Sequence, residues 1–379
     1  MKKTLALLLA IAFAVPAFAG NIFSNLTTRG EIETIGFTQT DDADQKSVAN
    51  RVLFGMSMDL VEDVRTNLTF AYNNVWAGWG GDTVDGYLNT IEVAEANVVV
   101  SNIFDALEVK IGRQYYGNED SPVMYIGPRK GYYAALAYPM FPNVMSVDGA
   151  LLTWEGEKAA FSAFYGQLTD GSDERITGLT YDYAFNNNLT AGIYWYDVNE
   201  YFGSNGHIGA WGGKLAYKTE EGSKLAVEYA KNYLGHVFGH NNEGWMLKVD
   251  GALNIDMEKV ALTPRITYYH TEKNFISLGN YTIGILFANE AVLPLSMIGA
   301  NLQIVNAGID FNVKAWEKVT FAFDYFNVRA DNEWAGNEWD LTAKYQLNDY
   351  VGFTLGGALV SNTDTEDVYG GQLGMLVKF

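Results

Sequence analysis

The chain contains no cysteine, and histidine occurs only four times in its 379 residues. Without disulfides it does not belong to the small secreted domains that depend on cross-links. His236 and His240 have the spacing of two metal ligands on a helix face, but they lie in a predicted loop with Gly239 between them. His270, at the end of a predicted strand, has no serine paired with it in sequence. We therefore predict no metal, no cofactor and no catalytic site.

Basic residues and long apolar runs are also scarce. Lys and Arg number 25 against 45 Asp and Glu, and the net charge of −20 makes nucleic acid an unsuitable partner. After residue 19 no uncharged apolar run reaches the ~18 residues of a membrane-spanning helix. The best candidate, residues 281–305, is interrupted by Asn289, Glu290 and Pro294. The sequence therefore excludes helical membrane spans after the leader.

The leader, residues 1–19, reads MKKTLALLLAIAFAVPAFA. Two lysines precede an apolar stretch from Leu5 to Ala14. The small residues Ala17 and Ala19, two positions apart, precede Gly20. This pattern is typical of a secretory signal peptide cleaved after Ala19. A first transmembrane helix is the weaker alternative, because the apolar stretch is shorter than the ~20 residues that a span needs. The working protein is then expected to comprise residues 20–379.

What the chain has in abundance is glycine, aromatic residues and a period of two. Aromatic residues make up 14%, with 24 tyrosines, and there are 39 glycines. In the closing stretch YGGQLGMLVKF, Tyr369, Leu373, Met375, Val377 and Phe379 share one face of a predicted strand. Glycine-rich, aromatic-rich alternation with weak overall hydropathy is typical of membrane β-barrels with aromatic girdles.

The connections between the alternating segments are short and long in turn. The short ones are residues 60–63, 104–106, 155–158, 186–188, 218–222, 254–258, 314–317 and 348–349. The long ones are residues 39–48, 74–89, 116–142, 169–174, 199–206, 234–243, 273–297, 330–337 and 362–366. Outer-membrane barrels place short turns on the periplasmic side and long loops outside. We predict one antiparallel barrel of eighteen strands over residues 20–379, with sixteen as the alternative because residues 24–38 and 298–313 alternate weakly.

The chain end fits such a barrel. The last strand must close against the first, so that no strand edge is left in lipid. Phe379 then lies in the periplasmic aromatic girdle, and a terminal phenylalanine resembles the signal read by the barrel-assembly machinery of Gram-negative bacteria. Outer-membrane lipid and lipopolysaccharide are the other expected partners.

Alternation also assigns charged side chains to the inner face, nine basic and twelve acidic, with Glu31, Glu33, Glu95, Asp182, Glu228, Glu338 and Asp340 among the acidic ones. The predicted pore-lining residues are Arg29, Arg51, Lys110, Asp148, Lys214, Lys248, Asp250, Arg265, Asp310, Asp324 and Lys344. Their charges could simply solvate the lumen and pair across strands. Alternatively, arginines such as Arg51 and Arg265 could line a constriction and bind an anionic solute.

Three stretches resemble the alginate-export family of outer-membrane porins. They are LEVKIGRQYYGNEDSPVMYIGP, SVDGALLTWEGEKAAFSAFYGQL and EWDLTAKYQLNDYVGFTLGGALV, with a Gly-Arg-Gln signature, an Asp-Gly pair and a Lys-Tyr step. The resemblance implies an eighteen-stranded barrel whose lumen passes an anionic polysaccharide, and it adds Arg113 to Asp148 as matched pore-lining residues. Alternation from Leu107 conflicts with it, because that phase puts Arg113 on the lipid side, so that either a bulge intervenes or Arg113 lies at the rim.

Two loops are long enough to narrow the barrel, residues 116–142 and 273–297. The first contains four prolines, many tyrosines and the adjacent basic residues Arg129 and Lys130. We name Arg129, Lys130, Tyr125 and Tyr132 as constriction candidates for acidic sugars, with an external cap as the alternative. Inward aromatics such as Tyr196 and Tyr269 could stack on sugars or pack beneath loops.

The sequence favours a porin of the Gram-negative outer membrane that passes small hydrophilic solutes or sugars, including anionic saccharides, by passive diffusion. A dedicated exporter of an anionic polysaccharide is less favoured, because the inner face is not strongly basic. A non-conducting surface barrel and a barrel enzyme are the remaining alternatives. An enzyme is disfavoured for want of a paired nucleophile and base.

Overall fold

The computed structural model describes residues 25–40, 45–76, 91–128, 146–168, 174–200, 206–237, 240–241, 243–273, 275–276, 279, 301–361 and 367–379. The predicted signal peptide, three of the four constriction candidates (Arg129, Lys130 and Tyr132) and the side chains of His236 and His240 lie outside this description.

The strands follow one another along nearly the whole described chain. They are β1 (Leu26–Thr40), β2 (Gln45–Val61), β3 (Val64–Trp76), β4 (Ile91–Ile103), β5 (Leu107–Gln114), β6 (Tyr116–Gly117), β7 (Tyr125–Ile126), β8 (Val147–Glu155), β9 (Ala159–Leu168), β10 (Arg175–Ala184), β11 (Leu189–Asn199), β12 (His207–Lys218), β13 (Lys224–Val237), β14 (His240–Asn241), β15 (Trp245–Ala252), β16 (Ile255–Asp256), β17 (Val260–Thr271), β18 (Leu302–Val313), β19 (Val319–Ala330), β20 (Glu333–Gln346), β21 (Val351–Ser361) and β22 (Val368–Lys378), with one 3₁₀ turn, η1 (Lys314–Trp316).

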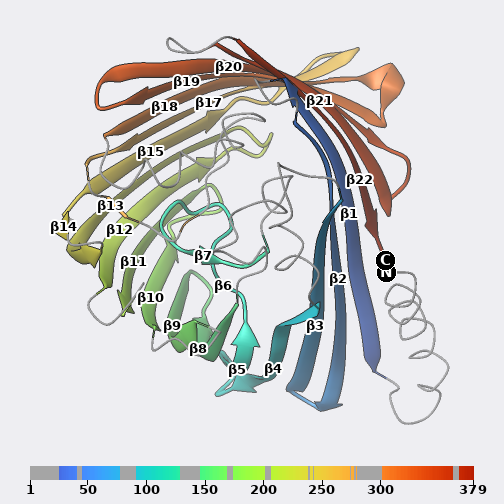
Figure 1. Ribbon diagram of the computed structural model, residues 1–379. Helices are drawn as coiled ribbons and strands as arrows, with labels where there is room; N and C mark the ends of the chain where they lie inside the picture. Colours follow the sequence, from blue (N-terminus) through green and yellow to red (C-terminus); the bar gives the residue numbers. More distant parts are fainter. Residues whose placement is uncertain are drawn as a thin grey trace.

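The long strands form a closed antiparallel barrel (Figure 1). Each long strand pairs with the next along the chain, and β22 returns to pair with β1 from Glu31 opposite Lys378 to Thr40 opposite Tyr369. Setting aside the two-residue strands β6, β7, β14 and β16, the barrel has 18 strands, so the predicted fold is confirmed and the alternative of sixteen is wrong. The two weakly alternating segments form β1 and β18.

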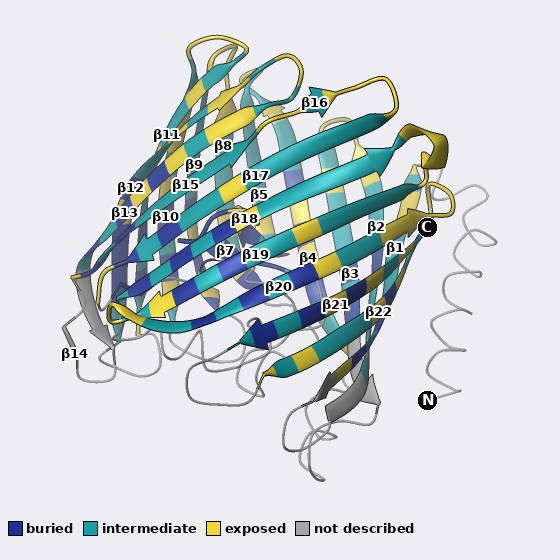
Figure 2. Ribbon diagram, turned by 90° about the horizontal axis from the view of Figure 1, so that it is seen from above, coloured by how far each residue is buried: buried dark blue, intermediate teal, exposed yellow. Residues whose placement is uncertain are grey.

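All the predicted short connections join consecutive barrel strands; most are tight turns, while the one at 254–258 includes β16 and the one at 314–317 includes η1. The long connection predicted at 330–337 is wrong, because only Asp331 and Asn332 separate β19 from β20 and the strand alternation continues through residues 333–337. Several of the short connections need left-handed backbone: Asp63, Phe104 and Asp105 have φ of 63°, 52° and 68°, and Gly222 has φ of 90°. Such residues suit the two-residue hairpin turns whose twist matches that of the strands. The C-terminus lies at the same end of the barrel as these turns (Figure 2).

The barrel wall has an apolar outer face. On that face Ile193, Leu355 and Leu373 are 64%, 61% and 62% exposed. The inner face of the wall contains the buried charged residues, among them Arg51 on β2 and Glu228 on β13. Because successive side chains of a strand point to opposite faces, the alternation in sequence becomes an apolar exterior around a polar interior. No helix in the described ranges is long and apolar enough to cross a membrane.

The barrel closes on its last residue. The Phe379 amide donates to the Gly30 carbonyl at 3.0 Å, and the Gly30 amide donates to the Phe379 carbonyl at 2.7 Å. The Phe379 ring covers Gly30, where a Cβ would overlap it, and stacks on Phe54 with ring centroids 6.4 Å apart. Glycine at position 30 thus makes room for the terminal ring against the first strand.

Candidate functional site

One long loop folds into the barrel. Its described part, residues 116–128, contains the two-residue strands β6 and β7, which pair with each other inside the ring of barrel strands (Figure 1). Tyr125 is buried, and its hydroxyl donates to the Pro128 carbonyl at 2.8 Å. For these residues the external-cap alternative does not hold. Tyr125 contributes to the turn of the loop rather than presenting its hydroxyl to the lumen.

The loop is anchored to the wall by the Tyr116 ring. This ring stacks on Phe164 of β9, with centroids 4.1 Å apart, and meets Tyr196 of β11 edge-on at 6.1 Å. On β10, Gly178 lies beneath the Tyr116 hydroxyl, and a Cβ at position 178 would overlap that oxygen. The hydroxyl is buried without a hydrogen-bond partner among the described residues, and burial raises its pKa, so the ring stays neutral.

Polar contacts fix the next part of the loop. Ser121 Oγ donates to the Glu228 carboxylate of β13 at 3.4 Å, and Tyr194 of β11 donates to the same oxygen at 2.8 Å. Lys248 of β15 donates from Nζ to the Asp120 carbonyl at 3.3 Å. Glu228 is 3% exposed, so the loop covers this carboxylate. The inner wall from β9 to β15 therefore holds the loop through an aromatic and a charged anchor.

The second predicted loop also reaches the interior where it is described. Asn232 of β13, fully buried, accepts from the Ile276 amide at 2.9 Å and donates to the Ile276 carbonyl at 3.0 Å. Its amide nitrogen also lies 3.3 Å from the Gly209 carbonyl. A Cβ at Gly279 would overlap the backbone of Pro122, so the two loops touch inside the barrel.

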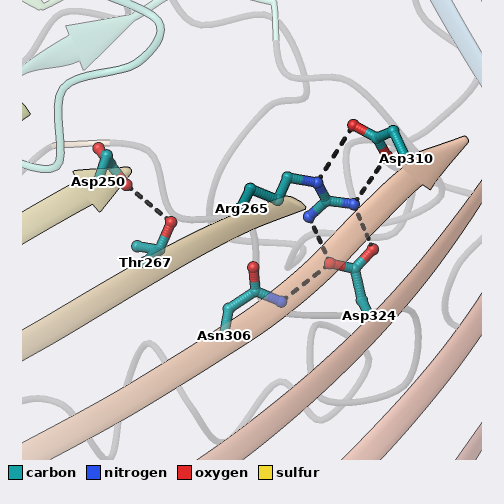
Figure 3. A network of polar contacts seen from close by, with 6 residues as sticks. All are labelled: Asp250, Arg265, Thr267, Asn306, Asp310 and Asp324. Carbon is teal, nitrogen blue, oxygen red and sulfur yellow. Dashed lines mark hydrogen bonds and ion pairs between the residues drawn. The ribbon is translucent and has the colours of Figure 1, made fainter. Parts of the chain in front are cut away.

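The predicted pore-lining residue Arg265 is central to a charged cluster on β17–β19, here called the Arg265 cluster, which comprises Arg265, Asp310 and Asp324 (Figure 3). The guanidinium donates to the two Asp310 oxygens at 3.2 and 3.0 Å, and to both Asp324 oxygens, at 2.7 Å for Oδ2. Asn306 donates to Asp324 at 3.0 Å. Gly308 lies between Arg265 and Asp324 in the register and leaves the space that the contact occupies.

A second cluster, the Arg51 cluster, comprises Arg51 of β2 and Glu31 and Glu33 of β1. Arg51 Nη2 lies 2.6 Å from a Glu31 oxygen and 2.9 Å from a Glu33 oxygen. The arginine side chain is 4% exposed, whereas Glu31 and Glu33 are 25% and 18% exposed. Nearby, Arg29 pairs with Glu95 at 3.0 Å.

A third group, the lysine row, crosses β10–β15. Its members are Asp182, Lys214, Glu228, Lys248 and Asp250. Lys214 is opposite Glu228, and Glu228 is opposite Lys248, in the strand register. Lys248 Nζ lies 3.0 Å from Asp250, and the Asp182 carboxylate reaches over Gly192, the partner of Lys214. Charges of opposite sign thus alternate along this part of the inner wall.

Two further predicted residues are on the inner face outside these clusters. Lys110 lies opposite Val99 and Leu151, both of which face inward. Lys344 lies opposite Thr320 and Thr354 and is exposed.

Arg113 and Asp148 were predicted to line the pore, but in the structure they face away from the lumen. The Arg113 Nε and Nη2 atoms donate to the two Asp148 oxygens, both at 3.1 Å. Asp148 follows Val147, which is buried inside, and Arg113 is two residues after Ile111, which is exposed outside. Strict alternation therefore continues to the strand ends and puts this ion pair on the outer face, near the long-loop rim. The inward assignment of Asp148 was an error of phase, and that of Arg113 came from the motif resemblance.

No metal site is apparent in the described ranges: no three His, Asp or Glu side chains converge there. His207 lies 2.8 Å from Asp197, and His270 stacks on Trp245 with ring centroids 4.8 Å apart. The inward aromatics Phe164, Tyr196 and Tyr269 are buried at the wall. Their position favours packing over an exposed sugar-stacking surface.

Solved structures of outer-membrane proteins share this fold. OprD from Pseudomonas aeruginosa has a TM-score of 0.65 and 12% identity, with 94% of each chain covered. OpdK from the same organism has a TM-score of 0.66 and 13% identity, covering 94% of this chain and 99% of that one. OccAB1 from Acinetobacter baumannii has a TM-score of 0.63 and 14% identity, covering 93% and 96%. No family model and no curated protein matches the sequence.

The resemblance to the alginate-export family is wrong, since the structural similarity is to OprD and related Occ proteins and no family model supports it. The Gly-Arg-Gln motif has a local structural explanation. Gly112 adopts φ of 122°, a conformation suited to glycine, and Gln114 is buried and donates to the Gly149 carbonyl at 3.1 Å. Arg113 forms the outer ion pair. The three residues finish the barrel strand β5.

Proposed function

We propose that this protein is a pore of the Gram-negative outer membrane through which small hydrophilic solutes diffuse passively. The observation that carries the proposal is the division of the closed wall into an apolar exterior and an interior with clusters of charged side chains. Charged groups arranged inside an apolar wall are costly unless water reaches them, so this division favours a hydrated lumen. A channel accounts for the described residues better than an enzyme does.

The inward loops give the pore its selectivity in this proposal. A barrel of this strand number is too wide for its wall side chains alone to fill. Residues 116–128 attach to the wall at β9–β15 through Tyr116, Ser121 and Asp120. This leaves the Arg51 cluster on the opposite wall, and the Arg265 cluster on the strands that follow β15, to face the remaining passage. We also propose that the signal peptide directs export and that the apolar outer face contacts lipid and lipopolysaccharide. Phe379 is proposed as the residue that the barrel-assembly machinery recognises.

Planar-bilayer recording on the purified, folded protein tests this function. We expect stepwise conductance in potassium chloride, and swelling of proteoliposomes in small neutral sugars. Heat-modifiable migration in electrophoresis confirms beforehand that the barrel is folded. If folded protein gives neither steps nor swelling, passive transport is refuted and a non-conducting surface barrel becomes the better explanation.

A further inference from the structure

The arginine side chains of the inner wall form ion pairs with carboxylates of the same wall. In the Arg265 cluster one guanidinium is shared by two carboxylates, and the Arg51 cluster repeats the arrangement with Glu31 and Glu33. The Nε, Nη1 and Nη2 atoms of Arg265 all donate to the two carboxylates, so few of its five N–H groups are left for a further anion. The Arg51 side chain is 4% exposed, so burial closes it to an anion in the lumen. The basic residues that the sequence suggests as anion-binding groups are thus already satisfied within the wall.

Each cluster also has one more carboxylate than it has cations. The Arg51 and Arg265 clusters contain two carboxylates for one arginine. In the lysine row Asp182, Glu228 and Asp250 accompany Lys214 and Lys248. With ordinary ionisation, each of the three therefore has a formal excess of one negative charge.

Access to solutes increases this bias in the two arginine clusters. Asp310 is 39% exposed, whereas Arg265 is 28% exposed, and the Arg51 guanidinium lies almost wholly behind its two glutamates. A solute in the lumen therefore meets carboxylate oxygens before it meets guanidinium. On the inward loop, Glu119 and Asp120 add acidic side chains on the same interior.

We infer that this pore prefers cationic solutes bearing ammonium groups over anionic ones, with the Arg51 cluster, the Arg265 cluster and the lysine row as its fixed negative charges. The inference rests on the proposed pore function. It replaces the expectation of anionic saccharides, which required arginines free to bind them. Arg29, Lys344 and Lys110 are inward cations outside the clusters, and their positive charge limits the preference to a moderate one. Arg29 is 72% exposed, whereas its partner Glu95 is 9% exposed.

The experiment measures reversal potentials across a planar bilayer in a potassium chloride gradient. We expect a potassium-to-chloride permeability ratio above one. Proteoliposome swelling should be faster with ethanolammonium than with glycolate, two ions of similar size and opposite charge. Asp310→Asn removes the most exposed carboxylate of the Arg265 cluster and should lower the permeability ratio by about twofold. A unit charge at about 8 Å in water, screened by ~0.1 M salt, attracts potassium and repels chloride by about 1.5-fold each. Asp310→Asn with Asp324→Asn frees the guanidinium and should lower it further.

The outer ion pair supplies a matched control. Arg113→Gln with Asp148→Asn removes charges from the same barrel but from its outer face, and should leave the ratio unchanged. If the double Asp variant does not fold, Asp310→Asn alone still decides, since it leaves the Asp324 contacts in place. Conductance with chloride preference, or a ratio that Asp310→Asn does not alter, overturns the inference while the pore stands. Absence of any conductance in the folded wild-type protein overturns the pore and the inference together.

Discussion

The contact between Gly178 and the Tyr116 hydroxyl makes a direct test of how the loop is held. Gly178→Ala would place a methyl group on that oxygen, and its nearest other neighbours would be Tyr116 Cζ and Tyr196 Cδ1, both at 3.0 Å. The ring cannot swing aside freely, because Phe164 stacks on its face. Overpacking of this kind costs about 1–3 kcal/mol. We therefore expect Gly178→Ala to destabilise the loop and the barrel that it packs against.

Tyr116→Phe removes the atom responsible for the overlap. The hydroxyl is buried and has no partner in the described part of the chain, so its loss should stabilise the fold by about 1 kcal/mol. In the Tyr116→Phe background, Gly178→Ala should cost less, because the closest contact is then 3.0 Å and can relax by a small shift. The coupling between the two substitutions should be on the order of 1–2 kcal/mol.

The assay is a double-mutant cycle on the free energy of unfolding, from urea titration of detergent-solubilised protein. Single-channel recording provides a second reading: Tyr116→Ala, which removes a buried ring at a cost of about 3–5 kcal/mol, should increase open-channel noise or conductance by loosening the loop. Tyr116→Phe is its control and should leave the channel quiet. Equal costs of Gly178→Ala in both backgrounds would refute the packing described for this anchor.

Three other substitutions test separate features of the fold. Asn232→Ala removes three hydrogen bonds to backbone atoms of β12 and the second loop, and should cost about 2–3 kcal/mol in the same urea titration. Gly30→Ala should displace the Phe379 ring and lower the yield of heat-modifiable barrel, whereas Gly36→Ala, with no neighbour closer than 3.8 Å, should not. Phe104→Gly relieves a left-handed backbone at an exposed residue and should stabilise the barrel by about 1 kcal/mol, measured as a higher urea midpoint.

The wall of this protein could be predicted from sequence because a strand of period two and a tight turn are local features. The eight short connections and the inward charges of the Arg51 and Arg265 clusters needed no knowledge of distant residues. The pairing of those charges was less accessible. Arg265 is separated from Asp324 by 59 residues, and they meet because Gly308 on the intervening strand leaves space, a role that an isolated glycine does not reveal. The sequence therefore suggests arginines that are free to bind an anion, whereas in the fold these arginines form ion pairs with carboxylates of the wall.

Phase was the other limit of the sequence interpretation. Alternation over its strand predicts that Asp148 faces inward, whereas the structure buries its neighbour Val147 on the inner face. Elsewhere the phase is changed by bulges, which shift the register between Gly209 and Ala210 and between Val328 and Arg329. A single extra residue moves every later side chain to the other face. Alternation in the middle of a strand therefore does not determine which face a residue at its end occupies.

The docking of the loops did leave a signal in the sequence, in the strands that receive them. In a wide barrel, inward positions near the long loops should be polar if water covers them. Here many of these positions are apolar and buried, as at Val147, Ile176, Val198, Met246 and Val328. A strand that is apolar on both faces at its long-loop end cannot face lipid on one side and open water on the other without exposing apolar surface to solvent. Its inner side must be covered by chain from the loops, and the Tyr116 and Asn232 anchors are how the described parts of two loops cover it. Inward apolar residues at strand ends are therefore the sequence feature that distinguishes a barrel narrowed by its own loops from an open one.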